Sequence, residues 1–446
     1  MLQLRRAVSA AVSSARLRRS LSAAASSPPW STIYTTMLVE SPELRASFLI
    51  AEPPSPSHLL VPAHLINPRP RPHPRPNPDS IATSGDGLLL LSFMDGYCTA
   101  TFDVLKRARD RESIGFDMDP DVLRFVCNPL SGQMLRLPDI DGTRKTSTSH
   151  CLGILTRSVR GRGPPDRYAV AELIVDHEGK ERSFVMRRLL SETGEWEELV
   201  GLPSPLPLPL ARRLDMDHEV VAFAGRLWWV DVSLGAVSAD PFSDRPDLRF
   251  VELPRGCVTE PVQGLHVLGR YRRLGVSEGR LRYAEVTQKD PFVLSSFALD
   301  DDGSSWTLKH RIELGRLSTD GGHEAQDALN ALHRRMAIVS QLWADGGHSM
   351  LELLDAPRIG LIDPLNASVI YLTIDNLAFS VDMERGKVLG CSTCCDPEAA
   401  PSFCSGFLKP CVLPPWLGSR RSLLRGTLSS NKANANLVCV DRDKKN

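Results

Sequence analysis

Residues 275–279, Gly-Val-Ser-Glu-Gly, place Ser277 between two glycines in the G-x-S-x-G spacing of serine hydrolases. In such enzymes a strand precedes the serine and a helix follows it, so that the serine stands on a sharp turn beside an oxyanion hole. Here residues 280–283, Arg-Leu-Arg-Tyr, alternate polar and apolar side chains, which is typical of a strand. Serine, glutamate and glycine also suit a hairpin turn. The sequence therefore favours a β-hairpin at Ser277, with a serine hydrolase as the alternative.

Five cysteines lie close together near the C-terminus: Cys391, Cys394, Cys395, Cys404 and Cys411. The C-x2-C pair that begins this group could chelate Zn²⁺, and Cys404 with Cys411 could complete a tetrahedron. However, six residues separate Cys404 from Cys411, which is longer than the usual spacing, and a fifth cysteine is superfluous. We therefore expect no cofactor, and a structural zinc ion at Cys391, Cys394, Cys404 and Cys411 stays as the alternative.

Trp228 and Trp229 are adjacent within the apolar segment 220–232. Successive side chains of a strand point to opposite faces of a sheet. We expect one tryptophan to pack between sheets and the other to lie near a surface or groove, where tryptophan often anchors an interface. Both are candidate binding residues, and core packing of the pair is the competing interpretation. Neither a G-x-x-x-x-G-K-[ST] phosphate loop nor an H-E-x-x-H metal helix occurs, so we assign no catalytic residue and expect no enzyme.

The elements that must position these residues are short apolar segments separated by Gly, Pro and Asp. Strand-length segments occur at 86–93, 123–128, 150–155, 167–175, 183–190, 220–232, 248–253, 279–286, 292–299, 369–374 and 377–383. Strands at such short spacing indicate a sandwich, barrel or propeller. One helix is expected over 324–344, where Ala325, Leu329, Leu332, Met336, Val339 and Trp343 recur at helical spacing.

A loose repeat joins a strand, an Asn-Pro or Asp-Pro pair, a Gly turn and a second strand, as in residues 125–138 and 228–254. A period of about 40–50 residues is typical of propeller blades. We therefore expect a mainly β fold of repeated antiparallel, propeller-like strands with one short helix insertion. The repeats are too degenerate to fix the number of blades.

Several segments resemble the plant domain of unknown function 1618, a family expanded in grasses: residues 225–256, 124–143, 274–286, 306–314, 360–391 and 407–419. The resemblance covers most of residues 40–420. No activity, substrate or cofactor is established for that family. Its strand segments are similar to those of F-box-associated and kelch-like propellers, which implies a protein-recognition scaffold. Residues 1–60 contain no leucine-rich F-box segment, so the resemblance does not imply a ubiquitin-ligase adaptor.

The N-terminal residues 1–36 are rich in Arg, Ser and Ala and contain no acidic residue, as in an organelle transit peptide. We expect import into the mitochondrion, with the chloroplast as the alternative, and the cytoplasm or nucleus if the leader has no targeting role. Residues 37–84 are expected to be an extended segment with a proline-rich linker, residues 85–395 the propeller-like domain, and residues 396–446 a loosely ordered tail. No apolar run is long enough to span a membrane.

Basic and acidic residues balance at 53 each, which gives no excess charge to attract nucleic acid. Taken together, these features predict a non-enzymatic binding scaffold that recognises a partner protein through propeller-type loops in an organelle. The alternatives are a serine hydrolase at Ser277 and a zinc-stabilised regulatory module at the C-terminal cysteines. The partner, the biological process and the oligomeric state stay open.

Overall fold

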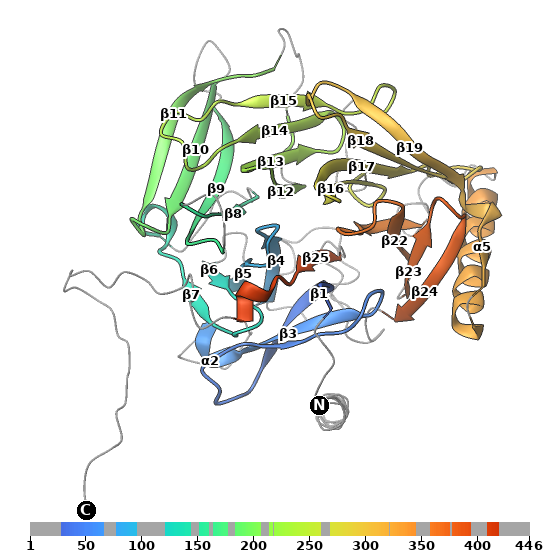
Figure 1. The fold of residues 1–446 in the computed structure, drawn as a ribbon, viewed down its shortest axis with the longest axis horizontal. Coiled ribbons are helices and arrows are strands. Elements are labelled where there is room, and N and C mark those ends of the chain that lie inside the picture. Colours follow the sequence, from blue (N-terminus) through green and yellow to red (C-terminus); the bar gives the residue numbers. More distant parts are fainter. Residues whose placement is uncertain are drawn as a thin grey trace, which may run out of the picture.

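The protein is mainly β, as the spacing of its apolar segments predicted (Figure 1). The computed structural model describes residues 28–66, 77–95, 121–143, 151–159, 164–176, 183–206, 214–216, 218–259, 268–320, 322–344, 357–374, 377–393 and 408–418. Most strands are four to eight residues long, and in many of them successive residues are buried, because both faces of the sheet are covered by neighbouring sheets.

Five antiparallel sheets follow one another along the chain as the blades of a propeller (Figure 1). Blade 1 contains β4 (Asn77–Thr83), β5 (Leu89–Asp95), β6 (Asp121–Cys127) and β7 (Met134–Arg136). Blade 2 contains β8 (Gly153–Arg157), β9 (Arg167–Asp176), β10 (Ser183–Leu190) and β11 (Trp196–Pro203). Blade 3 contains β12 (Glu219–Phe223), β13 (Arg226–Asp231), β14 (Gly235–Ala239) and β15 (Arg249–Glu252).

Blades 4 and 5 are separated in the sequence by a long helix. Blade 4 contains β16 (Arg272–Ser277), β17 (Arg280–Val286), β18 (Val293–Leu299) and β19 (Trp306–Glu313). Blade 5 contains β21 (Arg358–Ile362), β22 (Val369–Ile374), β23 (Leu377–Asp382) and β24 (Lys387–Thr393), and β20 (Ser318–Thr319) adds a short parallel strand to β24. The predicted helix is α5 (His323–Ala344), which packs on blade 5 through a buried stripe: Ala325, Leu329, Leu332, Met336 and Val339.

A sixth, mixed sheet joins segments from the two halves of the chain and completes the ring (Figure 1). Its strands are β2 (Ser47–Leu49), β3 (Pro56–Pro62), β1 (Trp30–Val39) and β25 (Lys409–Val412). β25 pairs antiparallel with β1, and β1 pairs parallel with β3. Among the described residues, the other elements are the short helix α2 (Ala63–Ile66) and the 3-10 turns η2 (Ile140–Gly142), η3 (Leu314–Arg316) and η4 (Pro415–Gly418).

The predicted domain boundaries differ from the observed ones at both ends. β1 begins at Trp30, inside the predicted leader 1–36, and β1 and β3 lie in the segment predicted to precede the domain at residue 85. β25 lies inside the segment 396–446 that was predicted to be a loose tail. The reason is long-range pairing, because Ile33 and Cys411 have no exposed area once β1, β3 and β25 form one sheet. Most of the predicted leader and of the proline-rich stretch 68–78 lies outside the described residues.

The segment 220–232, predicted as one strand, is a hairpin of β12 and β13. Ala224 and Gly225 form the turn with φ angles of 50° and 71°. Two successive positive φ angles are what a two-residue hairpin requires, and glycine adopts them at little cost. Within the described part of the chain, no helix has the length and apolar character needed to cross a bilayer.

Candidate functional site

Ser277 ends β16, and Glu278 and Gly279 connect that strand to β17. Their φ angles of 49° and 70° belong to a tight two-residue hairpin turn. A strand therefore follows Ser277, as the alternation of residues 280–283 indicated. The residue has no exposed surface, and its Oγ atom has no hydrogen-bond partner among the described residues. A nucleophile has to reach a substrate and a base, so this geometry does not favour a serine hydrolase.

Trp228 and Trp229 point to opposite faces of blade 3, as expected of adjacent strand residues, but both are buried. Trp229 packs in the core between blades 2 and 3 and donates a hydrogen bond from Nε1 to the carbonyl oxygen of Cys151 at 3.2 Å. Trp228 packs in the core between blades 3 and 4 and donates from Nε1 to Phe223 O at 3.2 Å. The prediction that one of them lies near a surface is wrong, because every blade face here is covered by the next blade.

The described C-terminal cysteines lie in two different cores. Cys391 is half-buried on β24 and packs against the core of blade 5, whereas Cys411 is fully buried on β25 in the core of blade 1 and the mixed sheet. Burial raises the pKa of the Cys411 thiol to about 12. Cys394, Cys395 and Cys404 lie outside the described residues, in which no group of three or more metal-ligating side chains is found.

A third thiol, that of Cys257, lies in a polar network between blades 3 and 4. The Cys257 Sγ atom donates to Glu285 Oε1 at 3.3 Å, and the Tyr283 hydroxyl donates to Glu285 Oε2 at 3.1 Å. Burial, followed by the charge of Glu285, raises the pKa of Cys257 to about 12. A thiol with that pKa stays protonated at neutral pH and is a poor nucleophile, so this network is suited to holding two blades together.

Three charged residues from different sheets meet near the axis of the ring. Glu219 begins β12, Arg273 lies in β16 and Lys409 begins β25. The Glu219 carboxylate is 2.6 Å from Lys409 Nζ through Oε1 and 3.3 Å from Arg273 Nε through Oε2. Arg273 Nη2 also donates to the Leu408 carbonyl oxygen at 2.9 Å. We call these three residues the axial charge cluster; it links blades 3 and 4 to the strand that closes the ring.

The axial charge cluster is buried, and its carboxylate is strongly stabilised in the ionised form. Burial alone would raise the pKa of Glu219, but the positive charges of Arg273, Lys409 and His218 lower it to about 2. The side chains of Glu219 and Arg273 are 9% and 3% exposed. No sequence motif indicates this cluster, because each of its members is a single charged residue on a separate strand. One carboxylate pairs with two cations from other sheets, which indicates a structural role in closing the ring.

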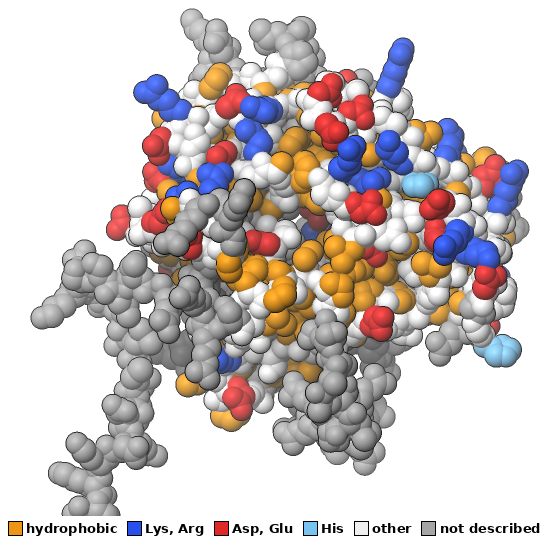
Figure 2. Space-filling model, viewed as in Figure 1, with side chains coloured by type: hydrophobic (Ala, Val, Ile, Leu, Met, Phe, Trp, Pro, Cys, Tyr) orange, Lys and Arg blue, Asp and Glu red, His pale blue; other side chains and the backbone are white. Residues whose placement is uncertain are grey.

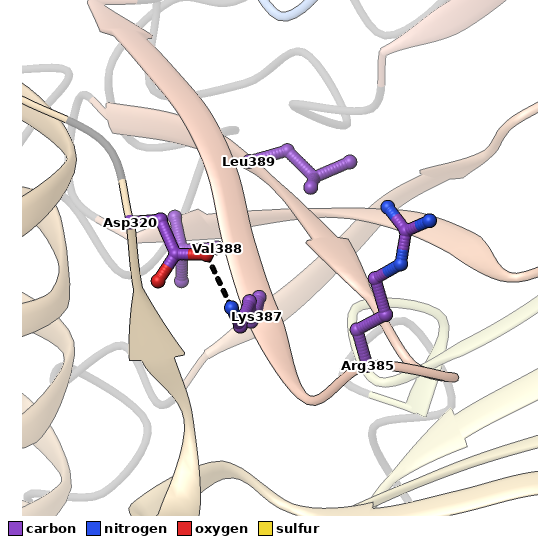
Figure 3. A pocket seen from close by; sticks show the side chains of 5 residues that line it. All are labelled: Asp320, Arg385, Lys387, Val388 and Leu389. Carbon is purple, nitrogen blue, oxygen red and sulfur yellow. Dashed lines mark hydrogen bonds and ion pairs between the residues drawn. The ribbon is translucent and has the colours of Figure 1, made fainter.

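An open recess of about 410 Å³ lies at the outer edge of blade 5, lined by Asp320, Arg385, Lys387, Val388 and Leu389 (Figure 3). Asp320, which follows β20, forms an ion pair with Lys387 on β24. Arg385 Nε lies 3.8 Å from Asp382 Oδ2, and the Arg385 side chain is 73% exposed. Leu389 is 49% exposed. The recess therefore offers a cation and an apolar side chain but no enclosed space for a small molecule.

The turns between the first and second strands of the blades lie together at one end of the ring. Neighbouring turns and strand ends are in contact there: Thr156 donates to Asp86 Oδ2 at 2.5 Å, Arg157 to Gly225 O at 3.2 Å, and Glu278 N to Pro364 O at 3.0 Å. We call this the hairpin end; it comprises residues 84–88, the described residues of 158–166, and residues 224–225, 278–279 and 363–368. Two of its apolar side chains are exposed, Val159 at 65% and Leu365 at 49%.

The face seen along the axis has an uneven distribution of side-chain types (Figure 2). Hydrophobic side chains gather toward its middle, whereas Lys, Arg, Asp and Glu lie mainly toward its outer parts. An apolar centre inside a charged surround is the arrangement found in protein–protein interfaces. Residues spread over several blades make such a surface, so sequence motifs could not reveal it.

Comparison with known proteins relates the middle part of the chain to a family and assigns no activity to it. No curated protein matches the chain. Among solved structures, two of AztD from Citrobacter koseri, one of them the apo protein, are similar at 10% identity and a TM-score of 0.29. These matches cover 72% of this chain and 74% and 73% of theirs. Residues 229–369, from blade 3 to blade 5, match the model of the family described as protein of unknown function (DUF1618).

Proposed function

We propose that the protein is a non-enzymatic binding scaffold that recognises a partner protein at the hairpin end of its propeller. The observation that carries this proposal is the pair of exposed apolar side chains at that end, Val159 and Leu365, at 65% and 49%. Val159 lies in the turn of blade 2 and Leu365 in that of blade 5, so each offers a partner protein a separate apolar contact at the same end of the ring. Two described side chains that are capable of covalent chemistry, Ser277 and Cys257, are buried, which supports the proposal.

The proposal is tested by comparing proteins captured by the purified full-length chain and by two surface variants. Leu365→Asp places a charge at the hairpin end. Val200→Asp is the matched control, since Val200 is 70% exposed on the outer strand β11 of blade 2. We expect quantitative mass spectrometry to find specific partners bound to the wild type and to Val200→Asp, and at least about tenfold less bound to Leu365→Asp, because a charge in an apolar contact costs 1–3 kcal/mol.

Two outcomes would count against this proposal. Equal capture by all three proteins would remove the hairpin end as the recognition surface. If a fluorophosphonate probe labelled the wild type but not Ser277→Ala, the result would support a serine hydrolase instead of a binding scaffold.

We also propose that the scaffold works in an organelle, preferably the mitochondrion, because residues 1–36 have the composition of a transit peptide. Trp30 and Ile33 are buried in β1, and Pro29 O accepts a hydrogen bond from Leu413 N at 2.8 Å. Removal of residues 29–36 with the leader would therefore take away part of the ring.

We expect a fusion that carries residues 1–40 to reach mitochondria, and the mature protein to begin before Pro29. Fluorescence microscopy and N-terminal sequencing check the two parts. Diffuse cytosolic fluorescence would contradict the targeting role, and a mature N-terminus beyond Trp30 would contradict the inferred position of cleavage.

A further inference from the structure

Arg282 is a buried cation on β17, in the face of blade 4 that packs toward blade 5. Its side chain is only 7% exposed. Arg282 stands opposite Gly275 on β16 and opposite Ala298 on β18. Side chains of directly paired residues share one face of a sheet, so the long arginine side chain has small neighbours on both sides. A Cβ atom added to Gly275 would lie 3.5 Å from Ile362 of blade 5, which shows that blade 5 forms the opposite wall.

The charge of Arg282 is only weakly compensated. Its nearest carboxylate is that of Glu278, with 3.9 Å between Nη2 and Oε2, and the Glu278 side chain is 53% exposed. The Nε and Nη1 atoms of Arg282 are buried and have no hydrogen-bond partner within the described part of the chain. Burial lowers the pKa of the Arg282 guanidinium, Glu278 raises it, and Arg280 lowers it further. Buried N–H groups of a cation are costly when they lack an acceptor.

The hydroxyl of Ser277 lies on the same face. Ser277 pairs with Arg280, so it is the diagonal neighbour of Arg282 across the two strands. Diagonal neighbours are within reach of a long side chain, and the approach of Nη2 to Glu278 directs the guanidinium toward the hairpin that carries Ser277. Ser277 Oγ is buried and, like Arg282 Nε and Nη1, has no hydrogen-bond partner among the described residues.

We propose that Arg282 and Ser277 form a binding site for a small monovalent inorganic anion, of the size of chloride, between blades 4 and 5. Two N–H groups and one O–H group supply three donors, and the guanidinium supplies a positive charge in a place shielded from solvent. A halide accepts several hydrogen bonds and also neutralises the positive charge of Arg282. A water molecule accepts hydrogen bonds but carries no charge to neutralise it. The small residues Gly275 and Ala298 beside Arg282 leave room for a ligand of a few atoms.

The test measures the melting temperature of the full-length protein as chloride replaces gluconate at constant ionic strength. Gluconate is much larger than a halide ion, so it serves as the reference anion. We expect chloride to raise the melting temperature of the wild type by about 2 °C or more once its concentration far exceeds the dissociation constant. Arg282→Met should lose this rise. Ser277→Ala should shift the midpoint to roughly tenfold higher chloride, as expected for one lost hydrogen bond to a charged group.

Arg280→Met is the matched control, because Arg280 lies two residues away on the same strand, is 43% exposed and forms an ion pair with Asp301. It should retain the chloride response of the wild type. Equal melting temperatures of the wild type in chloride and gluconate would overturn the proposal, and so would an equal loss in Arg280→Met and Arg282→Met.

Crystals of the wild type grown in bromide provide a second readout that needs no variant. An anomalous peak beside Arg282 supports the site, and density for water alone at that position overturns it. If Arg282→Met fails to fold, Ser277→Ala and the bromide crystals still decide between an anion and water.

Discussion

Glu219→Gln is expected to lower the free energy of unfolding by about 3–5 kcal/mol, because it leaves Arg273 as a buried charge without its carboxylate. The Glu219 side chain is 9% exposed and lies 3.3 Å from Arg273 Nε. Denaturation by urea, followed by circular dichroism, measures the change. Lys409→Met is the comparison variant and should cost less, because the Lys409 side chain is 20% exposed and loses less solvation on folding.

The same residue predicts a pH dependence. The pKa of Glu219 falls from its ordinary value of 4.5 to about 2 in the folded protein. A carboxylate with a lowered pKa stabilises the fold fully above its unfolded pKa and loses that effect as the pH falls through the folded pKa. This difference in pKa corresponds to about 3 kcal/mol. The gap in stability between the wild type and Glu219→Gln should therefore be constant above about pH 5 and shrink between about pH 4.5 and 2.

Two results would contradict the role given to the axial charge cluster. One is equal stability of the wild type and Glu219→Gln at pH 7. The other is a stability gap that stays unchanged down to pH 2. The double variant Glu219→Leu with Arg273→Leu should recover part of the loss, since removing both charges avoids an unpaired one.

Trp229→Ala is expected to lower the free energy of unfolding by about 3–5 kcal/mol through the cavity that it leaves between blades 2 and 3. Trp229 is 1% exposed, and its core includes Leu227, Leu173 and Phe184. The denaturant midpoint measures this loss. Trp196→Ala is the matched control, because Trp196 is a half-buried tryptophan on the outer strand β11.

The comparison separates packing from binding. A packing residue gives a much larger loss of stability than the Trp196 control, and a surface anchor would give a similar or smaller one. Equal losses in the two variants would mean that the core between blades 2 and 3 does not depend on Trp229.

Local patterns predicted much of the fold. The alternation of residues 280–283 predicted the hairpin at Ser277, and helical spacing predicted α5 within one residue at its N-terminal end. These predictions hold because alternation and helical spacing are set by neighbours in the sequence. Other features depend on which sheet covers which face. The burial of both Trp228 and Trp229, and the inclusion of β1 and β25 in one sheet, are features of this kind.

The sequence by itself determined the mainly β character, the repeated antiparallel strands, the long helix and the hairpin of the G-x-S-x-G motif. Only the tertiary structure decided that Ser277 is buried, that Glu219, Arg273 and Lys409 meet, and that Arg282 is enclosed between two blades. The physical reason is distance along the chain. Glu219 and Lys409 are 190 residues apart, and no local rule of spacing couples charges that meet only when the ring closes.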